Sequence, residues 1–429
     1  MSLFNIVKHN RVFKNATWIV VCKLAQAIFA VIINSLTARY FGPSDFGLIN
    51  YAASLVAFVT PLMTLGTSDI LVNEVIKNPK KQGEILGTSI TMTTVSSLCC
   101  VFGLFVFANC ANYGEPTAIW VVVLYSLLLI SQSLEQIQYW FHAQYLSKYV
   151  SIVSFCAYLL ISIYKIALLA TEKGIYWFAV SNSIDHLVIA ISLFVIYKVK
   201  KGQKLKFSVG MVKTLWDKGR HYILPELMGL VLAQSDRIML RFMCGDSEVG
   251  LYSAAYSICV MTSFVFSAII TSFRPLILQA KVESAEEYEH SIIKLYGIII
   301  YLSLLQSVCV SIFNPLIINI LYGESYISAV PILFVIIWYT PFSYIGSVRT
   351  VWVLAEDKQK YLWIISFTGM VLNIALNLVL IPFLKGTGAA IATLATQIFT
   401  NIIIVSLVKP LRINIKYILK SFNLKRIIK

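Results

Sequence analysis

The chain has 429 residues, of which 58% are hydrophobic and 13% are charged, and its formal net charge is +15. Soluble globular proteins carry about 25% charged residues, so this composition excludes a water-soluble fold. The positive charge does not indicate nucleic-acid binding, because the Lys and Arg residues lie in loops between apolar segments.

Apolar segments of about 20 residues, the length that crosses the hydrocarbon core of a bilayer, recur along the whole chain. They predict an all-α polytopic membrane protein. We expect no cleavable signal peptide, because the first apolar segment is too long for a signal sequence. Twelve spans are predicted, at 17–39, 46–68, 85–108, 117–140, 150–170, 176–197, 221–243, 250–273, 292–321, 329–354, 361–384 and 388–408.

The positions of Lys and Arg predict the orientation of these spans. Twelve spans place both termini on one side of the membrane. That side carries 27 of the 35 Lys and Arg residues, whereas the opposite side carries only Arg39, Lys173, Arg241 and Lys385. Since cytoplasmic loops are rich in Lys and Arg, both termini are predicted to be cytoplasmic.

A glycine-flanked turn occurs twice, at Gly42–Leu48 and Gly245–Leu251, with an offset of 203 residues. Glycine at both ends lets the turn close where a side chain would clash. We interpret the pair as an internal duplication. The predicted parts are an N-terminal six-helix lobe (1–197), a cytoplasmic basic amphipathic connector (198–220), a C-terminal six-helix lobe (221–408) and a basic cytoplasmic tail (409–429). The connector is expected to be a helix on the anionic membrane surface.

Four stretches along the chain carry a family resemblance. They are Arg39–Leu48, Ser235–Leu240 with Gly245–Ala255, Leu321–Leu333, and Asn373–Pro382 with Gly386–Thr393. In this order they resemble the Wzx-type O-antigen and polysaccharide flippases of the multidrug/oligosaccharidyl-lipid/polysaccharide exporter superfamily. The resemblance implies two six-helix lobes around a central cavity in the bacterial inner membrane. Equal numbers of spans in each half relate the lobes by a pseudo-twofold along the membrane normal.

The same resemblance implies that the protein moves an undecaprenyl-pyrophosphate-linked oligosaccharide across the bilayer by alternating access. Its expected partners are this lipid-linked substrate, the lipid bilayer, a coupling proton or sodium ion, and the polysaccharide polymerase machinery. Nucleic acid is not an expected partner. A multidrug/cation antiporter of the same superfamily is an alternative, against which the mixed and basic charges within the spans argue. A lipid II flippase usually resembles a longer chain with additional spans.

We do not expect an enzyme. The predicted outer loops are short, whereas a membrane glycosyltransferase or polymerase, the alternative from another class, needs room for an acceptor and catalytic acids. The sequence contains no phosphate-binding loop of the G-x-x-x-x-G-K-[ST] kind and no His, Cys and Asp cluster with metal-ligand spacing. Neither a catalytic residue, a metal nor a cofactor is therefore predicted.

Charged residues inside spans are costly, so each is a candidate functional residue. A pyrophosphate favours cations, and sugars favour amide, hydroxyl and aromatic groups. Lys23 and Asn34 share a small polar stripe on the first span, and Glu226 lies 203 residues after Lys23 in the seventh span. Together with Arg237 and Arg349, they are the candidate substrate-binding residues. Extension to the membrane surface is the alternative for Lys23, whereas for Arg349 and Lys165, which lie near span ends, this extension is expected.

Three acidic residues are candidates for binding a coupling ion. They are Glu135 on a polar stripe of the fourth span, Asp185 beside His186 in the sixth, and Asp236 in the seventh. Hydrogen bonding or ion pairing between helices is an equally open role for them. Asn373 and Asn377 lie one turn apart in the eleventh span, and packing between helices is their expected role.

Overall fold

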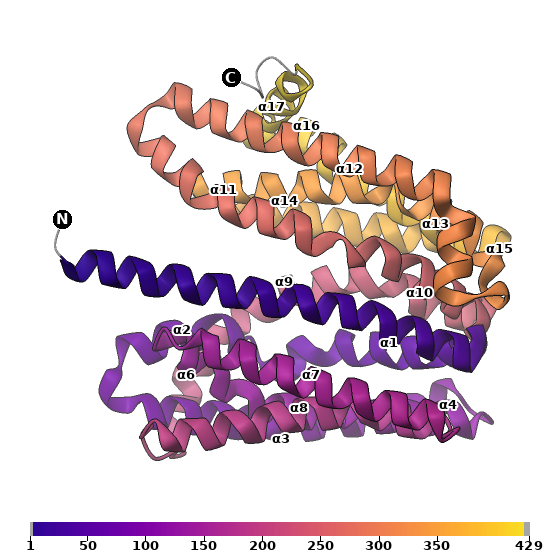
Figure 1. Cartoon of the computed structure of the whole chain (residues 1–429), viewed down its shortest axis with the longest axis horizontal. Coiled ribbons are helices and arrows are strands. Elements are labelled where there is room, and N and C mark those ends of the chain that lie inside the picture. The colour runs from indigo at the N-terminus through magenta and orange to yellow at the C-terminus, as the bar shows by residue number, and fades with distance from the viewer. Residues whose placement is uncertain (1–2, 424–429) are drawn as a thin grey trace. The chain divides into compact units, whose positions relative to one another are not determined.

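A computed structural model describes residues 3–423, and for residues 3–21, 24 and 69 it describes the backbone alone. Within the described residues the chain is almost entirely helical and contains no strand (Figure 1). It divides into two units. Unit 1 comprises Met1–Phe41 and Leu48–Leu230, and unit 2 comprises Gly42–Gly47 and Val231–Lys429. The predicted all-α fold with two lobes is confirmed.

Unit 1 is a bundle of helices joined by short turns. Its elements are α1 (Leu3–Thr64), α2 (Ser68–Lys77), η1 (Pro79–Lys81), α3 (Gln82–Ala111), α4 (Pro116–Ser126), α5 (Leu128–Leu134), η2 (Glu135–Ile137), α6 (Gln138–Ala143), α7 (Ser147–Ala170), α8 (Ile175–Val199) and the first part of α9 (Val209–Cys244). α7 and α8 pack side by side, and α8 also packs against α4 and α5. Ile85, Phe141 and Leu193 are among the buried side chains that form the apolar core of this unit.

Unit 2 is a second helical bundle. It contains the remainder of α9, then α10 (Asp246–Met261), α11 (Ser263–Glu283), α12 (Ala285–Tyr322), η3 (Glu324–Ala329), α13 (Val330–Ile336), α14 (Tyr339–Ala355), η4 (Gln359–Tyr361), α15 (Leu362–Ile398), η5 (Phe399–Ile403), α16 (Ile404–Leu407), η6 (Lys409–Leu411) and α17 (Ile413–Ser421). η5 is a short π-helical turn, and the other η elements are 3₁₀ turns. α12 packs against α11, α14 and α17.

Every predicted span falls on one helix or on successive helices, and the spans at 117–140 and 329–354 are divided among several. Among the described residues, eight helical segments are long and apolar enough to cross a membrane, and α13 with α14, a pair bent by 45°, makes a ninth. Backbone breaks at Gly42 and Lys385 divide two of these segments, so each of the two contains two predicted spans. α9 is not among the eight, and it contains the seventh predicted span with its Glu226, Asp236 and Arg237.

The two glycine-flanked turns have the same backbone conformation. Gly42 has φ 70° and ψ 179°, and Gly245 has φ 90° and ψ 177°. Residues with a side chain rarely adopt this conformation, whereas glycine adopts it readily. The shared geometry at an offset of 203 residues agrees with the duplication that the sequence predicted.

The second glycine of each turn packs against the backbone of the other turn. A Cβ on Gly47 would lie 1.8 Å from the carbonyl oxygen of Asp246, and a Cβ on Gly250 would lie 1.9 Å from that of Pro43. The two contacts are equivalent, because Gly47 and Gly250 are 203 residues apart, and so are Pro43 and Asp246. The turns approach so closely because neither glycine has a side chain.

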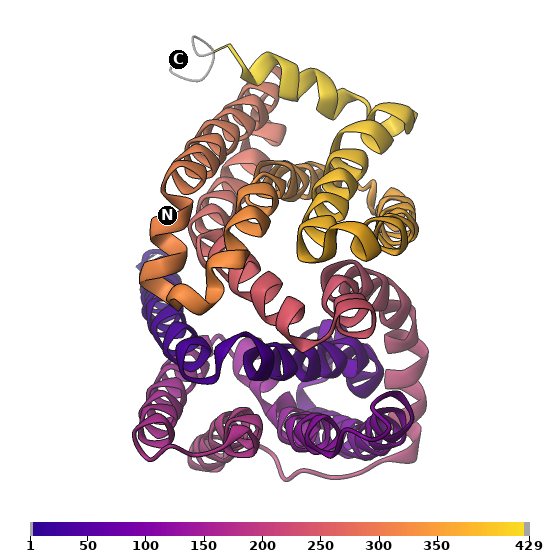
Figure 2. The same ribbon diagram turned by 90° about the vertical axis from the view of Figure 1, so that its right-hand side faces the viewer.

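The connector predicted at 198–220 is not a continuous helix. α8 ends at Val199 and α9 begins at Val209, and residues 202–208 between them form no helix (Figure 2). The backbone of this segment bonds instead to the start of α3. Lys206 N donates to Gly83 O at 3.1 Å, and Ser208 N donates to Thr88 Oγ1 at 3.0 Å. The helix prediction was wrong here because α3 satisfies the backbone groups that a helix would have paired internally.

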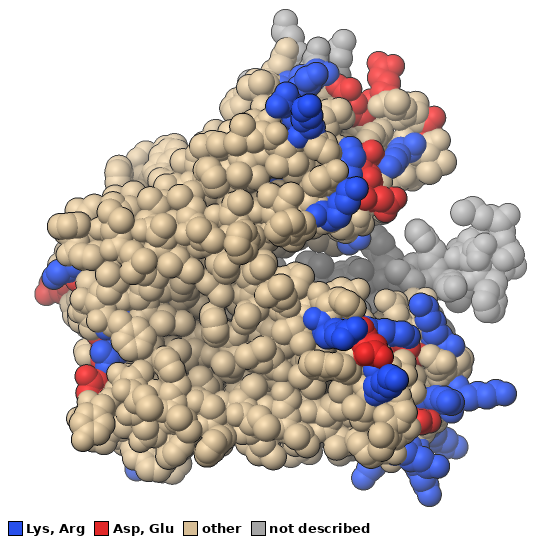
Figure 3. Space-filling view, turned by 180° about the vertical axis from the view of Figure 1, so that it is seen from behind, with Lys and Arg blue, Asp and Glu red and all other residues tan. Residues whose placement is uncertain are grey.

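Charged side chains gather at the ends of the helices, and a broad uncharged flank lies between them (Figure 3). α3 illustrates this flank, because it exposes Val95, Leu98 and Phe102 on one face, at 57%, 53% and 67% of their surface. Such a stripe is unfavourable in water and suits contact with lipid. The chain is therefore a multi-pass membrane protein.

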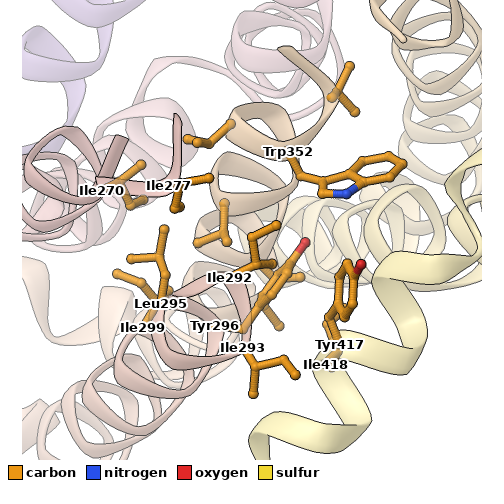
Figure 4. Close-up of a cluster of buried hydrophobic side chains, with 14 of the residues drawn as sticks. Ile270, Ile277, Ile292, Ile293, Leu295, Tyr296, Ile299, Trp352, Tyr417 and Ile418 are labelled. Carbon is orange, nitrogen blue, oxygen red and sulfur yellow. The ribbon is translucent and has the colours of Figure 1, made fainter. Parts of the chain in front are cut away.

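The predicted basic tail, 409–429, contains α17, and its last six residues, 424–429, lie outside the described residues. α17 packs on α12, where the Tyr296 hydroxyl donates to Asn414 Oδ1 at 2.9 Å. Tyr417 joins Tyr296 in a buried apolar cluster of unit 2 (Figure 4). The described part of the tail thus belongs to the folded core of unit 2.

Candidate functional site

A buried carboxylate lies at the centre of a hydrogen-bonded group in unit 2. Asp236 on α9 is only 3% exposed. Its Oδ1 accepts a hydrogen bond from Asn377 Nδ2 at 2.6 Å, and its Oδ2 accepts from the hydroxyls of Tyr252 at 2.5 Å and Thr393 at 2.6 Å. Asn377 Nδ2 also lies 3.1 Å from Asn373 Oδ1. We call these five residues the Asp236 hub.

The path of α15 brings two parts of the chain to this carboxylate. The backbone breaks at Lys385, with φ 49° and ψ −131°, and the chain then folds back. A Cβ on Gly388 would lie 2.5 Å from the carbonyl oxygen of Leu380, so the reversal needs glycine at that point. Asn377 before the break and Thr393 after it therefore reach the same aspartate.

All three groups that donate hydrogen bonds to the Asp236 carboxylate are electrically neutral. Three hydrogen bonds offset much of the cost of burying the carboxylate. Within the described part of the chain, no Lys or Arg forms an ion pair with Asp236, so its negative charge is not cancelled. Asn377 Oδ1 in the hub is also buried without a hydrogen-bond partner among the described residues. The hub thus presents several oxygen atoms around one uncompensated charge, a chemistry that hard cations favour.

A cation at the hub would depend on neutral oxygen ligands in addition to one carboxylate. In the part of the chain that the structure describes, no group of three or more His, Cys, Asp and Glu side chains could hold a metal ion. A site built from a multi-acid cluster is therefore absent from these residues.

Arg237 on α9 is half-buried and firmly held. Its Nε donates to Ser253 Oγ at 3.0 Å, and its Nη1 donates to Gln234 Oε1 at 2.7 Å. The guanidinium lies 4.7 Å from the ring centre of Tyr256, which stacks on Tyr339 with an interplanar angle of 4°. A guanidinium fixed by two hydrogen bonds and an aromatic face suits recognition of phosphate, and the neighbouring rings and amide suit a sugar.

The other predicted substrate residues lie in different surroundings. In unit 1, Lys23 is exposed and Asn34 is half-buried on α1, while Glu226 is half-buried on α9. Asn34 and Glu226 both interact with other residues. A substrate role for these three residues stays a prediction.

Arg349 on α14 is buried in unit 2, with 7% exposure. Its Nη1 donates to the Thr400 carbonyl oxygen at 3.2 Å and to Asn401 Oδ1 at 2.9 Å. Thr400 belongs to the π-helical turn η5, in which the usual helical hydrogen bonding is interrupted. The expectation that Arg349 extends to the membrane surface is therefore wrong, and its role in substrate binding stays a prediction.

A second polar group lies in unit 1. His186 Nδ1 and Glu135 Oε1 are 2.7 Å apart, and Lys165 Nζ donates to Asn182 Oδ1 at 3.0 Å. Asp185 Oδ1 is buried and has no hydrogen-bond partner within the described residues. We call Glu135, Lys165, Asn182, Asp185 and His186 the Glu135 cluster. The structure thus brings two of the three predicted coupling residues into one cluster, while Asp236 belongs to the hub of unit 2.

Sequence reasoning missed several of these contacts. The polar stripe through Glu135 assumed a regular helix, whereas the structure has a 3₁₀ turn at η2. The expectation that Lys165 extends to the interface was wrong, because Asn182 on the neighbouring helix binds it. Tyr252 was not predicted at all. No local pattern marks it, since its partners Asp236 and Thr393 are 16 and 141 residues away.

Apolar helices long enough to cross a membrane, arranged in two units with charged groups buried among them, define a polytopic α-helical membrane protein. The model of a family described as polysaccharide biosynthesis protein matches residues 12–281, and the chain belongs to that family. An uncharacterized membrane protein of Methanocaldococcus jannaschii is 26% identical over 236 residues. That match covers 51% of this chain and 46% of the relative, so the chain spans about half of the relative's length.

Solved structures of transporters have the same fold. The lipid II flippase MurJ in an inward closed conformation has a TM-score of 0.72 and 16% identity, covering 94% of this chain and 90% of that one. An inward-facing multidrug resistance MATE family transporter of the MOP superfamily has a TM-score of 0.60 and 13% identity, covering 93% and 96%. The MATE multidrug transporter DinF-BH has a TM-score of 0.63 and 11% identity, covering 94% and 96%. The TM-scores show that this chain shares the fold of these flippase and transporter structures, and the low identities limit the comparison to the fold.

Proposed function

We propose that the protein moves undecaprenyl-pyrophosphate-linked oligosaccharide repeat units, of O-antigen or a related polysaccharide, to the periplasmic leaflet of the bacterial inner membrane. The observation that carries this proposal is a polysaccharide biosynthesis family model matched by a chain with a transporter fold. The cargo starts in the cytoplasmic leaflet and crosses by alternating access, with both termini of the chain in the cytoplasm. No bond is made or broken, so the protein acts as a flippase and not as an enzyme.

Arg237 and its surroundings support this class of cargo. A pyrophosphate carries negative charge into a medium of low dielectric constant, where a fixed guanidinium lowers the barrier. The guanidinium is held over Tyr256 and beside Gln234, whose ring and amide suit a sugar. Lys23, Asn34, Glu226 and Arg349 are the further candidates for contact with the cargo.

A coupling ion is part of this proposal. Asp236 is its candidate site in unit 2, because the hub surrounds an uncancelled carboxylate with oxygen atoms. A sodium ion suits such a site, since hard cations prefer oxygen ligands. The cargo also implies that the protein works beside the polysaccharide polymerase machinery.

Deletion of the gene in a bacterial host tests the function. We expect loss of surface polysaccharide and accumulation of lipid-linked oligosaccharide in the cytoplasmic leaflet, both reversed by the wild-type gene. Arg237→Lys should reduce the transport rate on the order of tenfold, because lysine keeps the charge but loses the fork that bonds Ser253 and Gln234. Arg274→Lys, on an exposed part of α11, is the matched control and should match wild type.

The other outcomes identify the alternatives. Normal surface polysaccharide and no trapped intermediate in the deletion strain would contradict the proposal. Export of cationic dyes by the reconstituted protein, without effect on saccharides, would indicate the multidrug/cation antiporter. Sugar transfer by the purified protein would indicate a glycosyltransferase or polymerase.

A further inference from the structure

The charged side chains of unit 1 are distributed unevenly along its helices. Among α3 to α8, Glu84, His142, Lys148 and Lys198 lie near helix ends. The remaining charged residues and histidines of these helices are Glu135, Lys165, Asp185 and His186. These four come from α7, α8 and η2, and all of them belong to the Glu135 cluster. Charge placed at this depth is costly unless it is balanced or used.

The cluster is one positive charge short of balance. Glu135 and Asp185 are two carboxylates, Lys165 supplies one ammonium, and a neutral imidazole at His186 adds nothing. A single proton bound to the cluster would make it electrically neutral. Because a medium of low dielectric constant penalises net charge, the cluster favours taking up one proton.

The geometry identifies the pair that holds this proton. His186 Nδ1 lies 2.7 Å from Glu135 Oε1, so Nδ1–H can donate to the carboxylate and leave Nε2 with a free lone pair. The side chain of His186 is 27% exposed and that of Glu135 is 12% exposed. The imidazole is therefore the more accessible end of the pair.

The cluster is also ordered along the helices. Asn182 precedes His186 on α8 by four residues, which is about 6 Å along a helix axis. In the predicted orientation, Asn182 and Lys165 lie towards the outer side, and Glu135 lies five residues from the cytoplasmic end of its span at 117–140. In this orientation the side chains of the cluster are therefore spread through part of the membrane thickness, with Lys165 and Asn182 nearer the outer side than His186 and Glu135.

We propose that the Glu135–His186 pair is the proton-binding site of the transport cycle, which deepens the proposed function and rests on it. A proton adds to the Nε2 lone pair of His186, which converts imidazole to imidazolium while Glu135 keeps its carboxylate. The same proton leaves Nε2 later in the cycle, so the net charge of the cluster alternates between neutral and one negative charge. No co-reactant is needed.

The remaining groups around the pair are accounted for. Lys165 and Tyr158 on α7 and Asp185 on α8 interact electrostatically within the cluster. Of the other elements that pack against η2 or α8, α6 carries His142 and α3 carries Glu84, both near helix ends. Otherwise α3, α4 and α5 add uncharged polar groups, among them Gln132 and Thr93. Asp185 and Lys165 carry opposite charges, so the proton decides the net charge of the whole cluster.

Nitrogen-15 NMR of histidine-labelled, purified protein tests the site without cargo. The signal that is missing in His186→Gln belongs to His186, and we expect it to titrate between about pH 5 and pH 8. Glu135→Gln removes the charged partner and should shift the midpoint of this titration by about one pH unit or more. His142→Gln is the matched control, since His142 bonds Ser147 outside the cluster, and it should leave the His186 signal unchanged. A His186 signal that is constant across this range, or indifferent to Glu135→Gln, would overturn the proposal.

Transport measured at several external pH values in the deletion strain separates the proposed function from this inference. Wild type should respond to pH and to a protonophore, whereas His186→Gln and Glu135→Gln should transport at least tenfold more slowly and without a pH response. Both variants working with the wild-type pH profile would overturn the proton site and leave the flippase function standing. A wild-type gene that restores no polysaccharide would refute the function itself.

Discussion

The Asp236 hub of unit 2 and the Glu135 cluster of unit 1 bury carboxylates in different ways. Asp236 receives three hydrogen bonds from an amide and two hydroxyls, and no cation pairs with it among the described residues. Glu135 instead contacts a histidine, which can itself gain or lose a proton. Neutral donors stabilise one fixed charge state, whereas a titratable partner allows two.

This difference separates two kinds of ion site. The hub surrounds one carboxylate with additional oxygen atoms, which suits a bound cation. The cluster has charges of both signs and lacks one proton for balance, which suits proton exchange. Three experiments can break or sharpen the comparison.

The largest effect on stability is expected from a substitution in the Asp236 hub. Asp236→Ala leaves the donors of Tyr252, Thr393 and Asn377 buried without a partner, so it should cost on the order of 3 kcal/mol of stability. Asp236→Asn keeps the volume and should cost less. Thermal unfolding in detergent measures both, and Asp217→Ala, at an exposed position of the same helix, is the matched control. An Asp236→Ala variant that unfolds at the wild-type temperature would remove Asp236 from the centre of the hub.

Sodium distinguishes a cation site from a purely structural anchor in the same experiment. Wild type should unfold at a higher temperature in NaCl than in KCl, because binding to the folded state adds stability, about 1.4 kcal/mol at ten times Kd. Asp236→Asn should lose this difference. An equal response of both proteins to sodium would leave the hub with a structural role only.

An intermediate effect on stability is expected from a substitution in the Glu135 cluster. Lys165→Met leaves two carboxylates near each other with no ammonium, and should cost about 2 kcal/mol. Asp185→Asn added to this variant should recover about 1 kcal/mol, because the two residues interact. Lys173→Met in the exposed turn after α7 is the control. If the stability costs of Lys165→Met and Asp185→Asn simply add in the double variant, the two side chains do not balance each other's charge.

The smallest effect is expected for an ion pair outside the spans, at the end of α14. Burial acts to raise the pKa of Glu356, but hydrogen bonds from Lys281 and Tyr288 outweigh it and lower the pKa below its usual 4.5. Stability contributed by Glu356 is therefore complete above pH 4.5 and is lost as the pH falls through the lower folded value. The difference in unfolding temperature between wild type and Glu356→Gln should be small at pH 7 and should vanish in stronger acid. A difference that grows as the pH falls would have the wrong sign for this pair.

Much of the fold could be predicted because its signals are local. The apolar length of each span and the glycines of the two turns can be recognised within about 20 residues. The predicted spans lie on helical chain, although several are divided between successive helices. The connector at 202–208 was not predicted correctly, because its hydrogen bonds go to Gly83 and Thr88, about 120 residues earlier.

The candidate site was predictable only in part. The sequence identified Asp236, Asp185 and Glu135 as candidates, because a charged residue within an apolar segment can be recognised without knowing its partners. Tyr252 and Lys165 did not, because a tyrosine in a span or a lysine near its end has ordinary explanations. Their partners come from other helices, and only the packing of α10 with α15 and of α7 with α8 brings them together.

The sequence by itself determined that this chain is helical and lies in a bilayer, and it marked the two glycine turns, because hydrophobic length and backbone freedom are properties of short segments. Only the tertiary structure decided which buried charge meets neutral donors and which meets a histidine. Those partners are separated by 51 to 157 residues in most cases, and no periodicity along one helix encodes a contact with another.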